Sequence, residues 1–455
     1  MNPAIPPAAS TVLDSILFRD AFGTPRMRAI FSDHSLISKY VQVEIALARA
    51  EARCGVIPPE AAAQIAARAS VDALDFDLLR RETDIVGYPI LPLVNQVAKM
   101  CGEAGRYLHW GATTQDIMDS AVVLQIRAAL DLIEAELKDL RRILAGLALR
   151  YRDTPMAGRT HLQHALPITF GYKVAIWLAM LDRHQERFAQ LRPRVMVGSF
   201  AGAAGTLASL GDRGLEVQQA LMHELGLGVP IATWHVARDG FAESVNLLGL
   251  LTGSLGKIAY DVMLMASTEL AEVYEPFVKG RGASSTMPQK RNPISSELML
   301  AASKAVRQHA GLMLDAMVQD FERATGPWHA EWIALPESFM LTAGALHQAK
   351  FMLGGLIVDE KRMRRNLDMS NGLIVAEAVM MGLAPHIGRQ DAHDLVYAAC
   401  RKVNEEGGTL AEVLHAMPEI ASRLEPKEIA RLTDPANYLG ASAQMVERVL
   451  ASCSR

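Results

Sequence analysis

Aromatic residues and cysteines are scarce in this chain of 455 residues. Phe, Trp and Tyr together make up 6% of it, and it contains four cysteines. The cysteines lie far apart, without the spacing of metal ligands, which excludes a cysteine-based metal site and predicts reduced thiols in a cytoplasmic protein. They are Cys54, Cys101, Cys400 and Cys453.

Neither positive nor negative residues dominate the sequence, and no run of like charge occurs. The formal net charge is −4, which gives no indication of a nucleic-acid partner. An anionic substrate would therefore be held by local cations rather than by a global field. The N-terminus lacks the basic and apolar regions of a signal peptide, and no uncharged apolar stretch approaches the roughly 20 residues of a membrane span.

The chain does contain long patterns of apolar residues at helical spacing. Half of its residues are hydrophobic, and the abundant Ala, Leu and Met favour helices over strands. Between Gln115 and Tyr151 there is no proline and a single glycine. Similar patterns occupy 168–191, 240–275, 294–320 and 335–357. These patterns predict an elongated all-α bundle, and its extensive apolar faces predict self-association.

The chain is longer than one hydrophobic core usually serves, which predicts two or three domains. We expect an N-terminal helical domain over 1–107, where the helices are shorter. A central bundle of long helices is expected over 108–357. A C-terminal domain of short helices separated by glycines is expected over 358–455.

Residues 282–293 read Gly-Ala-Ser-Ser-Thr-Met-Pro-Gln-Lys-Arg-Asn-Pro and combine hydroxyl groups, a cation and an amide. The glycine and the two prolines predict a loop rather than the interior of a helix. A loop held by a rigid scaffold can bring a base and an anion clamp to one substrate. The candidate side chains are those of Ser284, Ser285, Met287, Lys290 and Asn292.

Residues 108–116, Leu-His-Trp-Gly-Ala-Thr-Thr-Gln-Asp, directly precede the first long helix. Thr113 and Thr114 fall where the start of a helix offers free backbone N–H groups, which can bind a carboxylate without a formal charge. The alternative interpretation is an ordinary helix cap.

Residues 159–166, Arg-Thr-His-Leu-Gln-His-Ala-Leu, cluster polar side chains before an expected helix start. His161 can donate a proton at neutral pH, because the ordinary pKa of histidine is about 6.5.

Residues 202–206, Gly-Ala-Ala-Gly-Thr, form a small-residue turn that lacks the strand and acidic partner of a dinucleotide site. Arg238 and Arg323 either hold an anionic group of a substrate or form salt bridges in the bundle.

The 282–293 run resembles the signature loop of the fumarase/aspartase superfamily, Gly-Ser-Ser-x-Met-Pro-x-Lys-x-Asn, with Ala283 added after the glycine. The segments at 108–116, 159–166 and 202–206 resemble further regions of the same family. The similarity covers nearly the whole chain and points to the branch of adenylosuccinate lyase and 3-carboxy-cis,cis-muconate cycloisomerase. It implies a three-domain all-α fold, a homotetramer with each active site built from three subunits, and no metal or organic cofactor.

Enzymes of this family remove a proton beside a carboxylate, and the resemblance implies a role for each matching residue. The implied catalytic residues are Ser284 as the base, His161 on the general-acid side and Lys290 in the clamp on the aci-carboxylate. The implied substrate-binding residues are Tyr88, Thr113, Thr114, Gln163, Arg238, Ser285, Met287, Asn292 and Arg323.

The chain departs from both branches. Cycloisomerases of the family tend to carry Trp in place of His161 and Gly-Asn in place of Gly87-Tyr88. Adenylosuccinate lyases carry His-Asp where this chain has Thr83-Asp84. An amine leaving group needs a proton, whereas lactone formation needs less help. His161 therefore favours cleavage of a C–N bond in an N-substituted aspartate, with release of fumarate.

Two alternatives stay open. The first is a 3-carboxy-cis,cis-muconate cycloisomerase, supported by overall similarity. The second is an inactive structural homologue, which the complete set of Ser284, Lys290, Asn292 and His161 disfavours. Either enzyme would act on a small anionic di- or tricarboxylate, and no nucleic-acid or membrane partner is expected.

Overall fold

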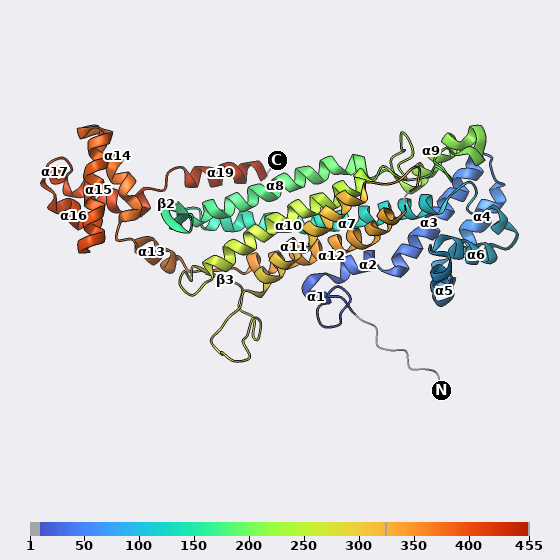
Figure 1. Ribbon diagram of the computed structural model, residues 1–455, viewed down its shortest axis with the longest axis horizontal. Helices are drawn as coiled ribbons and strands as arrows, with labels where there is room; N and C mark the ends of the chain where they lie inside the picture. Colours follow the sequence, from blue (N-terminus) through green and yellow to red (C-terminus); the bar gives the residue numbers. More distant parts are fainter. Residues whose placement is uncertain (1–9, 324, 454–455) are drawn as a thin grey trace. The chain divides into compact units, whose positions relative to one another are not determined.

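The computed structural model describes residues 10–323 and 325–453 and is 70% helical (Figure 1). The all-α prediction is therefore confirmed. Long helices occupy the middle of the sequence, as predicted. They are α7 (Thr114–Arg150), α8 (Phe170–Val195), α10 (Asp239–Met265), α11 (Ile294–Ala316) and α12 (Gly326–Gly354).

Helix α7 shows why the predicted pattern folds as it does. Its 37 residues contain no proline, and apolar positions at helical spacing, such as Ile117, Leu130 and Leu144, are fully buried. A helix of 37 residues rises about 55 Å at about 1.5 Å per residue, and α7 is the longest helix among the described residues.

Two long helices differ from their predicted bounds. The pattern at 240–275 ends early, because α10 stops at Met265 and Ala271 adopts a left-handed backbone conformation with φ of 50°. The pattern at 335–357 begins too late, because α12 already starts at Gly326. Pro327 fits the first turn of that helix, and Pro336 lies inside it without ending it.

The chain divides into two compact units. Unit 1 comprises Met1–Leu137, His184–Gly256 and Leu298–Gln348, and unit 2 comprises Lys138–Arg183, Lys257–Glu297 and Ala349–Arg455. Because several long helices contribute to both, the units interleave along the sequence. The domain boundaries near 107 and 357 stay predictions.

Among the shorter helices of unit 1, α3 (Asp33–Arg53) packs against α4 (Pro59–Arg68) and α9 (Gly214–Leu225) (Figure 1). The side chain of Ser32 caps the start of α3, and Tyr40 and Leu47 are buried on its inner face. The shorter helices are α1 (Arg19–Phe22), α2 (Pro25–Ile30), α3 (Asp33–Arg53), α4 (Pro59–Arg68), α5 (Phe76–Val86), α6 (Ile90–Cys101) and α9 (Gly214–Leu225), with 3-10 turns at Val71–Ala73, Gly102–Tyr107 and Ala208–Arg213.

Unit 2 contains the C-terminal helices, which share a small hydrophobic core that includes Leu383, Val396, Leu414 and Ile429. The helices around this core are α14 (Ala376–Ile387), α15 (Arg389–Glu406), α16 (Leu410–Ala416), α17 (Pro418–Ala421) and α18 (Pro426–Thr433). Outside it lie α13 (Glu360–Asp368), α19 (Ser442–Cys453) and the 3-10 turns at Leu373–Val375 and Pro435–Asn437.

Unit 2 also holds short strands that the sequence did not predict. Strands β1 (Pro155–Thr160) and β2 (Gln163–Thr169) form one antiparallel pair, and β3 (Val273–Tyr274) and β4 (Ile357–Val358) form another.

Helix α10 has the length and composition of a membrane span, but half of its apolar stretch is buried, as in the core helix of a bundle.

Candidate active site

The signature segment 282–293 forms a loop of unit 2 that is closed at its base by backbone contacts. The carbonyl oxygen of Gly282 accepts the N–H of Asn292 at 2.9 Å, and Ala283 pairs with Arg291 in an isolated antiparallel bridge. Gly282 has φ of 69°, and a Cβ there would lie 2.4 Å from the carbonyl oxygen of Asn292. The loop base therefore requires glycine.

Ser284, the predicted base, sits inside this loop with its Oγ facing the backbone. That oxygen accepts the N–H groups of Thr286 at 3.2 Å and Met287 at 3.0 Å. Hydrogen bonds to an oxygen favour its charged form, so this arrangement supplies part of the stabilisation that a serine alkoxide needs. Ser285 and Lys290 are exposed on the same loop, which leaves them open to a substrate.

The C-terminal end of the loop is tied to the start of helix α11. The carboxylate of Glu275 accepts the N–H groups of Ser295 at 3.0 Å and Ser296 at 2.8 Å, and also the hydroxyl of Ser296 at 2.8 Å. A carboxylate at a helix N-terminus is favoured by the free N–H groups and by the helix dipole. A rigid helix thus holds one end of a loop that is otherwise exposed.

His161 lies at the tip of the β1–β2 hairpin, and the second strand leads into helix α8 at Phe170, so a helix start does follow this segment. His161 and Leu162 form the two-residue connection, with φ of 51° and 61°. Left-handed conformations at both positions are typical of the tight turns that match strand twist, yet they cost non-glycine residues about 1–3 kcal/mol each. His161, Leu162 and Gln163 are all exposed.

A partly buried ion pair anchors this hairpin close to its turn, within unit 2. Arg159 donates to the two carboxylate oxygens of Glu272 at 2.6 and 3.0 Å, and Asn366 donates to the same carboxylate at 2.9 Å. Burial, together with the nearby Arg159, lowers the pKa of His164 on the opposite strand. His164 is therefore neutral at physiological pH, and the hairpin is held by Arg159 and Glu272.

Thr113 lies in unit 1 at the start of helix α7, where the sequence predicted free N–H groups. Its own N–H is not free, because it donates to the carboxylate of Asp116 at 3.0 Å. This contact is half of a capping box, with the acidic residue three positions into the helix. The N–H groups of Thr114 and Gln115 still lack acceptors within the helix, as in any first turn.

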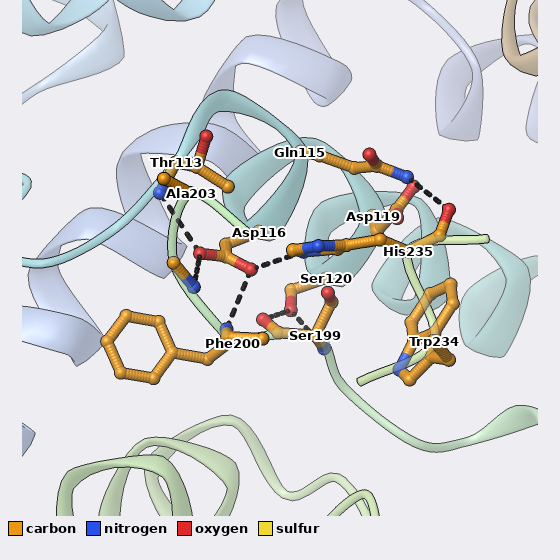
Figure 2. A network of polar contacts seen from close by, with 12 residues as sticks. Thr113, Gln115, Asp116, Asp119, Ser120, Ser199, Phe200, Ala203, Trp234 and His235 are labelled. Atoms are coloured by element: carbon orange, nitrogen blue, oxygen red, sulfur yellow. Dashed lines mark hydrogen bonds and ion pairs between the residues drawn. The ribbon is translucent and has the colours of Figure 1, made fainter. Parts of the chain in front are cut away.

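Asp116 is the centre of a buried polar network (Figure 2). Besides Thr113, its carboxylate accepts the N–H groups of Ala201 and Gly202, each at 2.9 Å, and Nε2 of His235 at 2.7 Å. The side chains of Asp116 and His235 are 1% and 0% exposed. The carboxylate therefore joins the start of α7 to the small-residue turn at 202–206, which resembles a region of the same family.

Arg323 also links the start of α7 to the 202–206 turn, through hydrogen bonds of its guanidinium. It donates to Oγ1 of Thr113 and to the carbonyl oxygen of Ala203, both at 2.8 Å. A hydroxyl that accepts a hydrogen bond from a cation must direct its own proton elsewhere. Thr113 can thus donate that proton to a substrate oxygen. Both acceptors of Arg323 are neutral, so these contacts do not cancel its charge.

Arg238 takes the salt-bridge role that the sequence had left open. It is 2% exposed, and it donates to both oxygens of Asp119, at 2.7 and 2.9 Å, and to Glu331 at 2.8 Å. Burial opposes its charge, yet the two carboxylates outweigh that effect and raise the pKa of Arg238. Burial also raises the pKa of Glu331. Arg238 thus holds the bundle of unit 1 together, and its guanidinium is occupied.

Tyr88 lies in an aromatic cluster of unit 1. Its ring centroid is 5.6 Å from that of Trp328, 5.7 Å from His329 and 6.1 Å from Trp332. The neighbouring Pro89, with Trp328 and Trp332, lines a cavity of about 670 Å³. Packing of this kind fixes the ring, so a substrate would meet one edge of Tyr88 rather than a mobile side chain.

The predicted residues thus fall into two groups. In unit 1 the structure brings Thr113 and Arg323 into contact, whereas Arg238 pairs with carboxylates. In unit 2 no hydrogen bond or ion pair among the described residues joins the hairpin tip to the 282–293 loop. Sequence reasoning missed Asp116, although a threonine followed three residues later by an acid is a capping signal. It also missed His235, for which no local signal exists.

Two family models match the chain. The model described as "Lyase" matches residues 21–307, and "Adenylosuccinate lyase C-terminus" matches residues 372–449. A solved structure described as fumarate lyase from Mesorhizobium sp. BNC1 is 57% identical. It superposes with a TM-score of 0.90, over 94% of this chain and 98% of that one.

Curated relatives of this chain differ in reaction. A 3-carboxy-cis,cis-muconate cycloisomerase of Pseudomonas aeruginosa is 48% identical over 96% of both chains. Trans-aconitate decarboxylase 1 of Mycosarcoma maydis is 48% identical over 95% of this chain and 88% of the relative. An N-acetyl-S-(2-succino)cysteine lyase of Dickeya dadantii is 39% identical over 97% of both. Similarity of this degree fixes the superfamily and leaves the substrate open.

Proposed function

Because the chain belongs to the fumarase/aspartase superfamily of lyases, we propose that it eliminates an amine from an N-substituted aspartate and releases fumarate. The observation that carries this proposal is the environment of Ser284, whose Oγ accepts two backbone N–H groups within the loop. A serine needs such stabilisation to act as a base, because its hydroxyl is otherwise too weakly acidic.

The proposed elimination has two steps, proton removal from carbon and cleavage of the C–N bond. Ser284 removes a proton from the substrate carbon next to one carboxylate, and charge builds up on that carboxylate as the aci form. Lys290 and Asn292 stabilise this charge, while Thr113 and Thr114 bind a substrate carboxylate. The C–N bond then breaks, a C=C bond forms, and the departing amine takes a proton from His161.

His161 supports an amine as the leaving group. Its position at an exposed hairpin tip presents the imidazole to solvent or to a neighbouring molecule, not to the interior of its own unit. Elimination from a succinyl group is also the reaction named for the N-acetyl-S-(2-succino)cysteine lyase, so a heteroatom at that carbon fits this fold.

The second candidate is a 3-carboxy-cis,cis-muconate cycloisomerase. It is favoured by a relative of that name at 48% identity over nearly the whole chain. This reaction shares the clamp on a carboxylate and the chemistry next to it, but it forms a lactone within one molecule. It therefore depends less on the proton that His161 supplies.

The proposed site is completed by self-association into a homotetramer. Large apolar side chains are exposed along the long helices, including Leu250 and Tyr260 of α10, Leu314 of α11 and Ile333 of α12. Exposed apolar faces of this kind mark protein interfaces. Association would allow the exposed hairpin of one subunit to reach the loop and helix start of others.

The test is a panel of N-substituted aspartates, with 3-carboxy-cis,cis-muconate alongside, followed by ultraviolet absorbance. We expect fumarate to appear from at least one aspartate derivative, and Ser284→Ala to abolish turnover without changing the oligomer. Loss of muconate absorbance without fumarate release would favour the second candidate. Products other than fumarate or a lactone would contradict both.

A further inference from the structure

Two segments that are distant in sequence, one of which binds the substrate carboxylate in the proposed function, share one buried partner. The start of helix α7 supplies Thr113, and the turn at 202–206 follows Ala201 some 85 residues later. The carboxylate of Asp116 accepts N–H groups from both segments, through Thr113, Ala201 and Gly202. Its position therefore sets the distance between them.

His235 holds this carboxylate in place. Its Nε2 lies 2.7 Å from Oδ1 of Asp116, while its Nδ1 is buried without a hydrogen-bond partner among the described residues. A proton on Nδ1 would have no acceptor, so the geometry assigns the proton to Nε2, where Asp116 accepts it. The backbone of His235 is fixed in turn, because its carbonyl oxygen accepts from Gln115 at 2.8 Å.

We propose that Asp116, oriented by His235, is a positioning residue that sets the spacing between Thr113 and the 202–206 turn and thereby the affinity of the enzyme for a substrate carboxylate. The carboxylate of Asp116 is buried and fully used, so it does not touch the substrate itself. This inference rests on the proposed role of Thr113 and Thr114 in binding a carboxylate.

The chemistry of the site makes Asp116 hard to replace. All four of its partners are donors, and an ionised carboxylate has only acceptors to offer them. In Asp116→Asn the amide nitrogen must take the place of one oxygen. If it replaces Oδ2, it faces the N–H groups of Thr113 and Gly202. If it replaces Oδ1, it faces that of Ala201. In either orientation a buried donor meets a donor, and the two segments must move apart.

Matched variants separate positioning from stability. His235→Gln keeps an N–H near the place of Nε2, whereas His235→Leu removes it at similar size. Ser120→Ala is the control, because Ser120 also joins α7 to the segment before the turn, through two buried hydrogen bonds with Ser199 at 2.7 and 2.8 Å (Figure 2). It ties the same elements together but does not contact the turn at 202–206.

The experiment measures binding of fumarate and of 3-carboxy-cis,cis-muconate to the full-length protein by calorimetry, together with KM and kcat. We expect Asp116→Asn and His235→Leu to weaken the binding of the better probe at least about tenfold, with a larger change in KM than in kcat. His235→Gln and Ser120→Ala should stay within about twofold of the unmodified protein, although Ser120→Ala should lower the melting temperature.

Several outcomes would overturn the inference. Equal losses of affinity in Ser120→Ala and Asp116→Asn would show a general structural role. Unchanged affinity in His235→Leu would remove the positioning role, as would failure of the unmodified protein to bind either probe. Failure of the proposed function has another signature, in which the unmodified protein binds a probe but releases no fumarate from any aspartate derivative.

Discussion

At the scale of single residues, Glu51 shows how strongly burial can change ionisation. Its side chain lies inside unit 1 with no exposed surface, and neither carboxyl oxygen has a hydrogen-bond partner among the described residues. Burial, with a smaller contribution from the nearby Glu44, raises the pKa of Glu51 to about 9. The native protein thus holds a neutral carboxylic acid at this position at pH 7.

This pKa predicts a pH-dependent difference between the protein and its Glu51→Gln variant. Between pH 5 and 9 the native state keeps the proton of Glu51, whereas the unfolded chain has lost it. The contribution of this group to stability therefore falls as pH rises, by about 1.4 kcal/mol per pH unit, and is largest at acid pH. Glutamine cannot ionise, so the variant should gain relative stability up to about pH 9. Urea unfolding midpoints from pH 5 to 9 measure this, and a pH-independent difference would contradict it.

Arg238 and Arg323 should differ in what their removal affects: protein stability for Arg238 and substrate affinity for Arg323. Arg238→Ala leaves Asp119 and Glu331 buried without their cation, and we expect a loss of about 3–5 kcal/mol in the free energy of unfolding. Arg323→Ala removes contacts to Thr113 and Ala203 at the partly exposed edge of the site, so stability should change little while KM rises about tenfold. Denaturant titration and steady-state kinetics on both variants test this, and similar stability losses in the two would contradict it.

At the scale of elements, the β1–β2 hairpin stores strain at the position of the proposed general acid. Its turn places His161 and Leu162, neither of them glycine, in left-handed conformations. The paired strands on both sides of the turn and the partly buried Arg159–Glu272 contact keep the turn in this form. The imidazole of His161 is consequently presented by a rigid element rather than by a mobile loop.

A pair of substitutions at Leu162 tests this strain. Leu162→Gly suits a positive φ, so the turn should keep its form and kcat/KM should stay within about threefold. Leu162→Val also shortens the side chain, but β-branched residues tolerate positive φ poorly, so kcat/KM should fall more than tenfold. Equal losses in the two variants would show that the leucine side chain matters and the turn conformation does not.

Elements with a strong local pattern were predictable from the sequence, and contacts across long separations were not. The run from Gln115 to Tyr151 indicated α7 because it lacks proline and repeats apolar residues at one period. The 282–293 loop was evident from its glycine and prolines. The hairpin was missed because its strands are short and lead directly into α8. The partners of Arg238 lie 93 and 119 residues away, so no local pattern could separate its two roles.

At the scale of the whole molecule, the proposed tetramer would explain why the proposed catalytic residues lie on exposed elements. His161 and Lys290 are both exposed in a single chain, and a site built from several subunits would bury them on assembly. Such a site exists only in the oligomer, so dilution below the dissociation constant of the assembly should reduce specific activity along with the fraction of oligomer.

Mixing inactive variants tests the composite site directly. Ser284→Ala and His161→Ala should each be inactive alone. After dissociation and joint reassembly, about a quarter of the sites should combine an intact serine from one subunit with an intact histidine from another. Recovered activity in the mixture, with light scattering to verify the assembly, would support the proposal. No recovery from verified mixed oligomers would place both residues within one subunit.

The position of His161 also bears on how this fold diversifies. The imidazole sits at the tip of a two-residue turn, and His161, Leu162 and Gln163 are exposed, away from the hydrophobic core of their own unit. In the proposed mechanism, replacing the histidine exchanges the group that protonates the leaving atom while the packed helices stay as they are. Under that mechanism, evolution can explore new leaving groups at this tip with little loss of stability, while the proposed proton abstraction by Ser284 stays the same.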